Sequence, residues 1–496
     1  MYPFPFLFRS ITKEKRNIIF VPVFSGDRKV WLFMKTLKEK YIGDKSFYKM
    51  VLLVALPIMI QNGITNFVSL LDNIMVGQLG TEQMSGVAIV NQLLNVYNIC
   101  IFGAVSGASI FSAQFYGQGN HEGVRDAFRF KLVSCMMLLL LGLAIFTAGG
   151  NTLIQFFLND GNAAQIAATQ GAGMQYLTIM MIGMIPFTIT QTYASTLRET
   201  GQTLLPMVAG ISAVFVNLVL DYGFIFGIAG IPAMGVRGAA IATVIARVIE
   251  MSIVVIWTHC NQTRNIFVRN VYRSFKIPKT LIKQIIRKGT PLLLNETLWS
   301  GGMAVLSQCY SMRGLDAVAA INISTTVSNL FNVVFIALGS SISIVVGQQL
   351  GAGELEKAVD TDRKMIFFSV ACCFVMGFAM QFVASAFPNI YNTSDVVKDM
   401  AATLIRIASL FMPLYAFYHA SYFTLRSGGK TVITFLFDSC YLWVINIPVA
   451  FVLSRYTNMG LIPIYLTCQC AEIVKGVVGF VLLKKKVWVN NIVNTI

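Results

Sequence analysis

The feature that most constrains this chain is a series of twelve apolar runs, each long enough to cross a membrane as a helix. A helix needs about 20 mostly apolar residues to span the hydrocarbon core. The runs contain scattered Gly and Pro and lack the strict alternation of a membrane β-barrel. We therefore expect an all-α polytopic membrane protein with transmembrane helices near 50–71, 84–111, 132–158, 172–197, 203–228, 236–258, 290–311, 317–346, 365–387, 401–425, 431–453 and 460–483.

Composition agrees with this fold class. Only 12% of the 496 residues are charged, whereas soluble domains carry about 25%. A soluble chain of this length would form roughly three domains, and so few charges are too few to cover their surfaces. Lipid, by contrast, requires little polar surface. The bilayer is therefore the expected surrounding medium.

The basic residues predict the topology. Of the 38 Lys and Arg, eleven precede the first run and eight lie in 259–289, and most of the others fall in loops on that same side. The positive-inside rule makes this side cytoplasmic, so both termini are predicted to be cytoplasmic in a cell membrane. The net charge of +16 then reflects topology and does not indicate nucleic-acid binding.

The two halves of the chain repeat each other. Pro57 matches Pro291 at an offset of 234, and the same offset aligns several polar and glycine positions. Such repeats are typical of transporters and predict a pseudo-twofold axis with a cavity between the bundles. The further matched pairs are Gly80 with Gly314, Gln114 with Gln348, Gly117-Gln118-Gly119 with Gly351-Ala352-Gly353, Thr196-Leu197-Arg198 with Thr424-Leu425-Arg426, and Asn217 with Asn446.

This repeat sets the expected domain boundaries. Two six-helix bundles, 50–258 and 290–486, are joined by the basic linker 259–289 and followed by a tail, 487–496. Residues 1–49 form a cytoplasmic extension. Because Met34 opens the basic amphipathic stretch that leads into the first run, we expect residues 1–33 to be dispensable.

Six acids lie within or at the edges of the apolar runs, where a charge is costly and is a functional candidate by default. Spacing of three residues predicts ion pairs of Glu250 with Arg247 and of Glu472 with Lys475 on their own helices. Asp438 is ambiguous. The other three are Asp72, Asp221 and Glu296.

Asp72 and Asp221 have few cationic side chains available to neutralise them in their bundle. Asn217 and Asp221 are four residues apart and so share one helix face. An amide oxygen beside a carboxylate suits Na⁺, but it equally suits a protonated carboxylic acid or a plain interhelical polar contact. The repeat places Leu306 and Ala450 opposite the two acids, which confines the pair to the first bundle.

Other reactive residues form no recognisable site in the sequence. The nine Cys show neither a metal-binding nor a disulfide pattern, and the three His are scattered. His419 lies among aromatic residues, and we expect packing to explain it. No Walker motif is present. An integral-membrane enzyme and an ATP-driven pump are therefore disfavoured, and no cofactor is expected. The two-bundle repeat with acids confined to one bundle disfavours a channel.

Several motifs resemble the multidrug and toxic compound extrusion (MATE) transporters over about residues 45–486. They are Pro57 with LLDNIMVGQLG at 70–80, TLRETGQT at 196–203, VNLVLDYGFIFG at 216–227 and GVRGAAIAT at 235–243. The resemblance implies an exporter driven by inward flow of Na⁺ or H⁺. It assigns ion coupling to Asp72, Asn217, Asp221 and Thr243, a hinge to Pro57, and a second-bundle acid to Glu296.

The resemblance also implies alternating access and amphipathic organic cations as substrates, handled by a monomer. Carboxylates, Met and aromatic side chains suit such ligands. The alternative within the same superfamily is a lipid-linked oligosaccharide flippase, which would need several cavity Arg or Lys to hold pyrophosphate. The candidate cavity residues are Asn66, Met180, Met181, Met184, Gln191 and Tyr193.

Overall fold

The computed structural model describes residues 38–158, 162–227 and 232–494, and none of these residues forms a strand. The expectation that 1–33 are dispensable lies outside the described residues. The helices of the first half are α2 (Lys45–Gly77), α3 (Thr81–Gln118), α4 (His121–Gln155), α5 (Ala163–Glu199), α6 (Leu204–Phe226) and α7 (Val236–Cys260). Two short 3₁₀ turns, Ile266–Val268 and Val271–Arg273, follow in the linker.

The second half contains α8 (Lys279–Ser311), α9 (Leu315–Gly351), α10 (Leu355–Ala386), the 3₁₀ turn Phe387–Ile390, α11 (Asp395–Ser427) and α14 (Leu461–Lys484). Between α11 and α14 the chain forms α12 (Thr431–Phe435), two π-helical segments, Leu436–Cys440 and Leu442–Asn446, and α13 (Ile447–Tyr456). π-Helical turns are rare and occur frequently at functional sites. Asp438 and Asn446 both lie in these segments.

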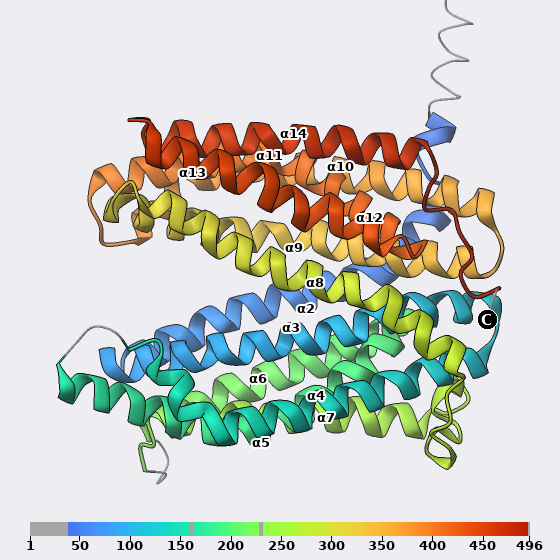
Figure 1. The fold of residues 1–496 in the computed structure, drawn as a ribbon, viewed down its shortest axis with the longest axis horizontal. Helices are drawn as coiled ribbons and strands as arrows, with labels where there is room; N and C mark the ends of the chain where they lie inside the picture. Colours follow the sequence, from blue (N-terminus) through green and yellow to red (C-terminus); the bar gives the residue numbers. More distant parts are fainter. Residues whose placement is uncertain (1–37, 159–161, 228–231, 495–496) are drawn as a thin grey trace, which may run out of the picture.

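Eleven described helical segments are long and apolar enough to cross a membrane. The predicted span 290–311 lies in α8, which falls outside this group because Asn295 and Glu296 interrupt its apolar half. α8 still runs lengthwise beside α9, α12 and α13 (Figure 1). Many helices exceed their predicted spans. α3, with 38 residues, is about 57 Å long and extends well beyond a hydrocarbon core of about 30 Å.

The helices gather into two groups (Figure 1). In the first, α3 packs against α4 and α5, α5 against α7, and α6 against α2 and α7. In the second, α11 packs against α9, α10 and α14, and α8 packs against α12 and α13. The groups meet where α3 contacts α8 and α9 and where α2 contacts α9.

Repeat-matched glycines explain how the groups meet. A Cβ on Gly117 would overlap the Gln348 carbonyl, and a Cβ on Gly351 would overlap the Gln114 carbonyl, so α3 and α9 cross through a reciprocal backbone contact. Gly107 packs in the same way against Gly289 of α8. Only residues without side chains permit this approach. The glycine–glutamine pairs seen in the sequence are thus the interface between the two halves.

The C-terminal tail lies at this same end of the molecule (Figure 1). Trp488 is 1% exposed, and its carbonyl packs against Gly428. Gln114 of α3 donates to the Ser427 carbonyl at 2.9 Å and accepts from the Ile492 amide at 2.8 Å. The Asn491 side chain donates to the Gly351 carbonyl at 3.0 Å. The tail therefore joins both helix groups at one end, which we name the tail end.

Candidate ion-coupling pair and membrane cavity

The structure brings Asp72 and Asp221 together. Asp72 lies near the end of α2 and Asp221 near the end of α6, and these two helices pack side by side. The two carboxyl groups lie close enough to interact electrostatically, and Asn217 lies one turn before Asp221 on the same helix. Asp221 is 2% exposed. The three residues that the sequence grouped thus lie in one polar cluster.

The cluster carries unsatisfied polar atoms. One carboxyl oxygen of each Asp and the side-chain nitrogen of Asn217 are buried without a hydrogen-bond partner. None of the ion pairs formed by the described residues includes either acid. Two adjacent carboxylates in a site of low dielectric cannot both stay charged without a counter-charge. The arrangement therefore suits a shared proton or a small hard cation held by carboxylate and amide oxygens.

No hydrogen bond formed by the described residues joins Thr243 or Pro57 to this cluster. The Thr243 hydroxyl donates to the Ala239 carbonyl of its own helix at 3.0 Å. Pro57 lies inside α2, fifteen residues before Asp72, and the helix continues through it. Because Pro removes one intrahelical hydrogen bond, α2 has a built-in weak point on the same helix as Asp72.

Most of the predicted cavity residues lie elsewhere. Met180 and Met184 are 2% and 0% exposed in the hydrophobic core of the first helix group, against which Met181 packs. Tyr193 is 1% exposed, and its hydroxyl bonds to His259 at 3.0 Å and to Tyr272. In this conformation these side chains pack against protein instead of lining the cavity. Gln191 is half-buried on α5.

Asn66 does line a cavity, and it is joined there mostly by residues of the second half. This cavity has a volume of about 670 Å³ and lies among α8, α9, α11, α14 and the π-helical segments. Its described lining includes Asp438, Asn446, Glu472, Lys475 and His419. Polar residues and aromatic rings converge on it, as in small-molecule sites.

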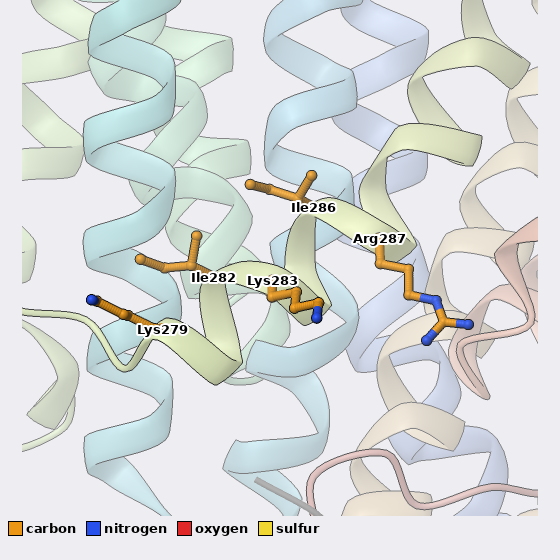
Figure 2. Close-up of a pocket in the computed structure, with 5 residues that line it drawn as sticks. All are labelled: Lys279, Ile282, Lys283, Ile286 and Arg287. Atoms are coloured by element: carbon orange, nitrogen blue, oxygen red, sulfur yellow. The ribbon is translucent and has the colours of Figure 1, made fainter.

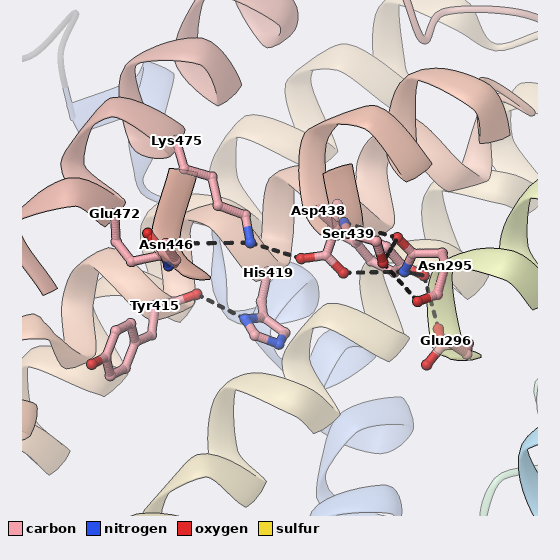
Figure 3. A network of polar contacts seen from close by, with 10 residues as sticks. Asn295, Glu296, Tyr415, His419, Asp438, Ser439, Asn446, Glu472 and Lys475 are labelled. Carbon is pink, nitrogen blue, oxygen red and sulfur yellow. Dashed lines mark hydrogen bonds and ion pairs between the residues drawn. The ribbon is translucent and has the colours of Figure 1, made fainter. Parts of the chain in front are cut away.

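The cavity charges form a network that sequence spacing did not predict (Figure 3). The Lys475 ammonium group binds Asp438 at 2.7 Å and lies 4.0 Å from Glu472. Asn295 donates to the other Asp438 oxygen at 3.1 Å. The ion pair that spacing predicted, Lys475 with Glu472, is therefore the weaker of the two. Lys475 on α14 binds Asp438 in the π-helical segment instead. Two sequence signals pointed to this cavity, namely the repeat match of Asn446 to Asn217 and the presence of Asp438 and Glu472 among the acids of the apolar runs.

One further predicted interaction, the ion pair of Arg247 with Glu250, differs from the structure. No ion pair forms between Arg247 and Glu250, since the Arg247 guanidinium donates instead to the Gly183 carbonyl at 3.2 Å. Glu296 accepts from the Tyr422 hydroxyl at 3.0 Å and sits beside the network without lining the cavity (Figure 3). The His419 ring packs at a tilt against Phe335, with ring centres 4.5 Å apart, and His419 also lines the cavity.

A second, shallower depression lies on a basic surface at the start of α8, away from the polar cavity. Lys279, Ile282, Lys283, Ile286 and Arg287 line a depression of about 490 Å³ (Figure 2). Their spacing along the helix alternates cations with apolar side chains on one exposed face. Such a face suits anionic lipid head groups at the membrane boundary.

Two homologous groups of membrane-length helices, with buried acids in one and a polar cavity in the other, define a polytopic membrane transporter. A family model described as MatE matches residues 57–223 and 291–452. The chain belongs to the MatE family. The two matched segments begin 234 residues apart, which is the offset of the internal repeat.

Similar proteins cover nearly the whole chain. "Probable multidrug resistance protein NorM" of Thermotoga maritima is 26% identical over 440 residues, covering 87% of this chain and 90% of that protein. "Probable multidrug resistance protein YoeA" of Bacillus subtilis is 23% identical, covering 92% and 99%. The solved structure "Outward-facing conformation of a multidrug resistance MATE family transporter of the MOP superfamily" superposes with a TM-score of 0.81 at 21% identity, covering 90% and 96%.

These findings confirm the predicted fold class and family. The chain is a multi-pass membrane protein of a transporter family, and the family does not consist of enzymes.

Proposed function

We propose that the protein is an antiporter that exports amphipathic organic cations in exchange for inward-moving Na⁺ or H⁺. The observation that carries the proposal is the proximity of Asp72 and Asp221, two membrane acids that take part in none of the ion pairs of the described residues. A site that must be neutralised by a mobile cation can couple its occupancy to conformation, because the two conformations then differ in ion affinity. The names of the similar proteins support multidrug export.

In the proposed cycle, Asp72 and Asp221 take up the ion from outside, with Asn217 and Thr243 completing the ion-coupling group. Neutralisation removes the penalty for closing α2 and α6 around the acids. α2 then bends near Pro57, and the organic substrate leaves. The tail-end contacts between the helix groups separate, the ion is released inside, and another substrate binds.

The cavity chemistry favours this proposal over a lipid-linked oligosaccharide flippase. Lys475 is the one cationic side chain among its described lining residues, and it is already paired with Asp438. A pyrophosphate carries several negative charges and requires unpaired Arg or Lys. The cavity offers unpaired acceptors instead, which suits a cation.

The test is ethidium efflux from proteoliposomes under an imposed Na⁺ gradient or an imposed pH gradient. One of the two gradients is expected to drive efflux by the wild type, and Asp221→Asn is expected to lose that response. Asp399→Asn is the matched control, because Asp399 is an exposed acid on α11. Gradient-driven efflux by Asp221→Asn at the wild-type rate would contradict the proposed coupling of ion entry to export through Asp221.

We also propose a monomer in the cell membrane with both termini in the cytoplasm. The basic start of α8 and the tail lie at one end of the molecule, where the Lys288 ammonium group donates to the Gly429 carbonyl at 2.7 Å. This end is then the cytoplasmic one. A C-terminal green fluorescent protein, which folds only in the cytoplasm, should be fluorescent. Light scattering of the purified protein should give the mass of one chain.

A further inference from the structure

The cavity of the second half has the size and lining of an organic-ligand site. Its volume of about 670 Å³ lies within the usual range of about 300–1,000 Å³ for small-molecule pockets. Asp72 and Asp221 do not line it. Six aromatic rings of its wall come from α8, α9, α11 and α14, namely Trp299, Tyr310, Phe335, Tyr415, Tyr418 and Tyr465.

The charges in this cavity are unequally satisfied. Asp438 accepts from Lys475 through one oxygen and from Asn295 through the other, so its charge is balanced and its acceptors are used (Figure 3). Lys475 also lies over the Tyr418 ring, 4.3 Å from its centre. The lysine is thereby held toward Asp438. Glu472, whose second oxygen lies 4.0 Å from the same ammonium group, gives the cavity one more negative charge than the lysine balances.

Glu472 and Asn446 both retain a free acceptor. The Asn446 amide donates to one Glu472 oxygen, and the other Glu472 oxygen is buried without a hydrogen-bond partner. The side-chain oxygen of Asn446 also lacks a partner, although Asn446 is only 4% exposed. Buried acceptors without donors are costly. A ligand that brings N–H groups or a positive charge would satisfy both.

The internal repeat gives an independent reason to single out Asn446. It occupies the position that corresponds to Asn217 in the first half. In the first half this Asn lies one turn from Asp221 on the same helix, and in the second half it donates to Glu472 on α14. The second pair opens onto an aromatic cavity, so its occupant has the size of an organic molecule.

We propose that Glu472 and Asn446 form the site that binds the cationic group of the organic substrate, while its apolar body contacts the aromatic wall. A cation is favoured because ring faces attract positive charge and because the cavity lysine is already paired. The assignment rests on the proposed export of organic cations. In this assignment the first half binds the coupling ion at Asp72 and Asp221, and the second half binds the substrate at Glu472.

The first test is equilibrium binding of ethidium to the purified full-length protein, followed by fluorescence. Glu472→Gln is expected to raise the Kd about tenfold or more, because a buried charge partner is lost. Glu250→Gln is the matched control, since it makes the same change at a membrane acid that does not line the cavity. Glu472→Asp, which keeps the charge, is expected to recover much of the affinity.

The second test uses the wild-type protein, so its result does not depend on whether the variants fold. N,N′-dicyclohexylcarbodiimide modifies carboxyl groups in apolar surroundings, and mass spectrometry locates them. Saturating ethidium is expected to protect Glu472 and to leave the modification of Glu250 unchanged. Unaltered affinity in Glu472→Gln, or unaltered modification of Glu472, would overturn the site.

These outcomes separate the site from the proposed function. If the wild type transports ethidium under a gradient while neither test implicates Glu472, the site assignment is wrong and the export proposal stands. If the wild type transports ethidium under neither gradient, the export proposal fails, whatever the binding data show.

Discussion

At the scale of single residues, Lys475 shows what spacing along a helix does not determine. The i, i+3 rule predicts Glu472 as its partner, but the ammonium group lies 2.7 Å from Asp438 and 4.0 Å from Glu472. A buried lysine pairs with the acid that it reaches with the best geometry. Asp438 precedes it by 37 residues, and only the packing of α14 against the π-helical segment brings the two together.

Removing this lysine is expected to destabilise the protein strongly. Lys475→Met leaves Asp438 as a buried charge with no cation, which costs about 3–5 kcal/mol. A second change, Asp438→Asn, should restore most of the loss by removing that charge. The measurement is the thermal unfolding midpoint of the detergent-solubilised protein.

Lys357→Met near the N-terminal end of α10 is the matched control. Its ion pair with Glu354 is 2.9 Å long, but the two side chains are 64% and 47% exposed. Exposed pairs contribute about 0–1 kcal/mol, so the midpoint should barely move. Equal effects of the two lysine substitutions would contradict the structural role given to Lys475.

At the scale of elements, the sequence predicted the helices well, because apolar length is a local property. It showed the repeat-matched glycines but not their contact, which depends on how α3 and α9 cross. The π-helical segments were not predictable from the sequence, because hydrogen bonds to another helix accompany them. The Ser439 amide donates to the Asn295 side chain at 3.2 Å, and the Ser439 hydroxyl donates to the Asn295 carbonyl at 2.7 Å. Asp438 and Asn446 therefore became recognisable as cavity residues only in the structure.

The reciprocal glycine contact predicts the effect of one methyl group. Gly351→Ala puts a Cβ into the Gln114 backbone, which forces α3 and α9 apart at the tail end. Overpacking of this kind costs about 1–3 kcal/mol, and the thermal unfolding midpoint should fall. Gly171→Ala on α5 meets nothing within 4 Å and should be neutral or slightly stabilising. A midpoint for Gly351→Ala at or above that of Gly171→Ala would disprove the close crossing.

At the scale of the whole molecule, two homologous helix groups meet closely at the tail end and carry different polar sites. Gln348 of α9 donates to the Glu199 carbonyl of α5 at 2.7 Å, and the tail adds bonds to both groups. The asymmetry was predicted in part. The sequence selected Asp72, Asn217 and Asp221, because buried acids are rare in apolar runs. Met180 and Met184 stay predicted cavity residues, and in this conformation they are buried in the hydrophobic core of the first helix group.

The central claim is that Asp72 and Asp221 act as one ion-coupling unit. The most direct test is the initial rate of gradient-driven ethidium efflux by the wild type, Asp72→Asn, Asp221→Asn and the double variant in proteoliposomes. Residues that act as a unit give non-additive losses. The account predicts the same residual efflux rate in all three variants, equal to the passive leak measured without an imposed gradient. A wild-type response in either single variant, or partial losses that add in the double variant, would contradict it.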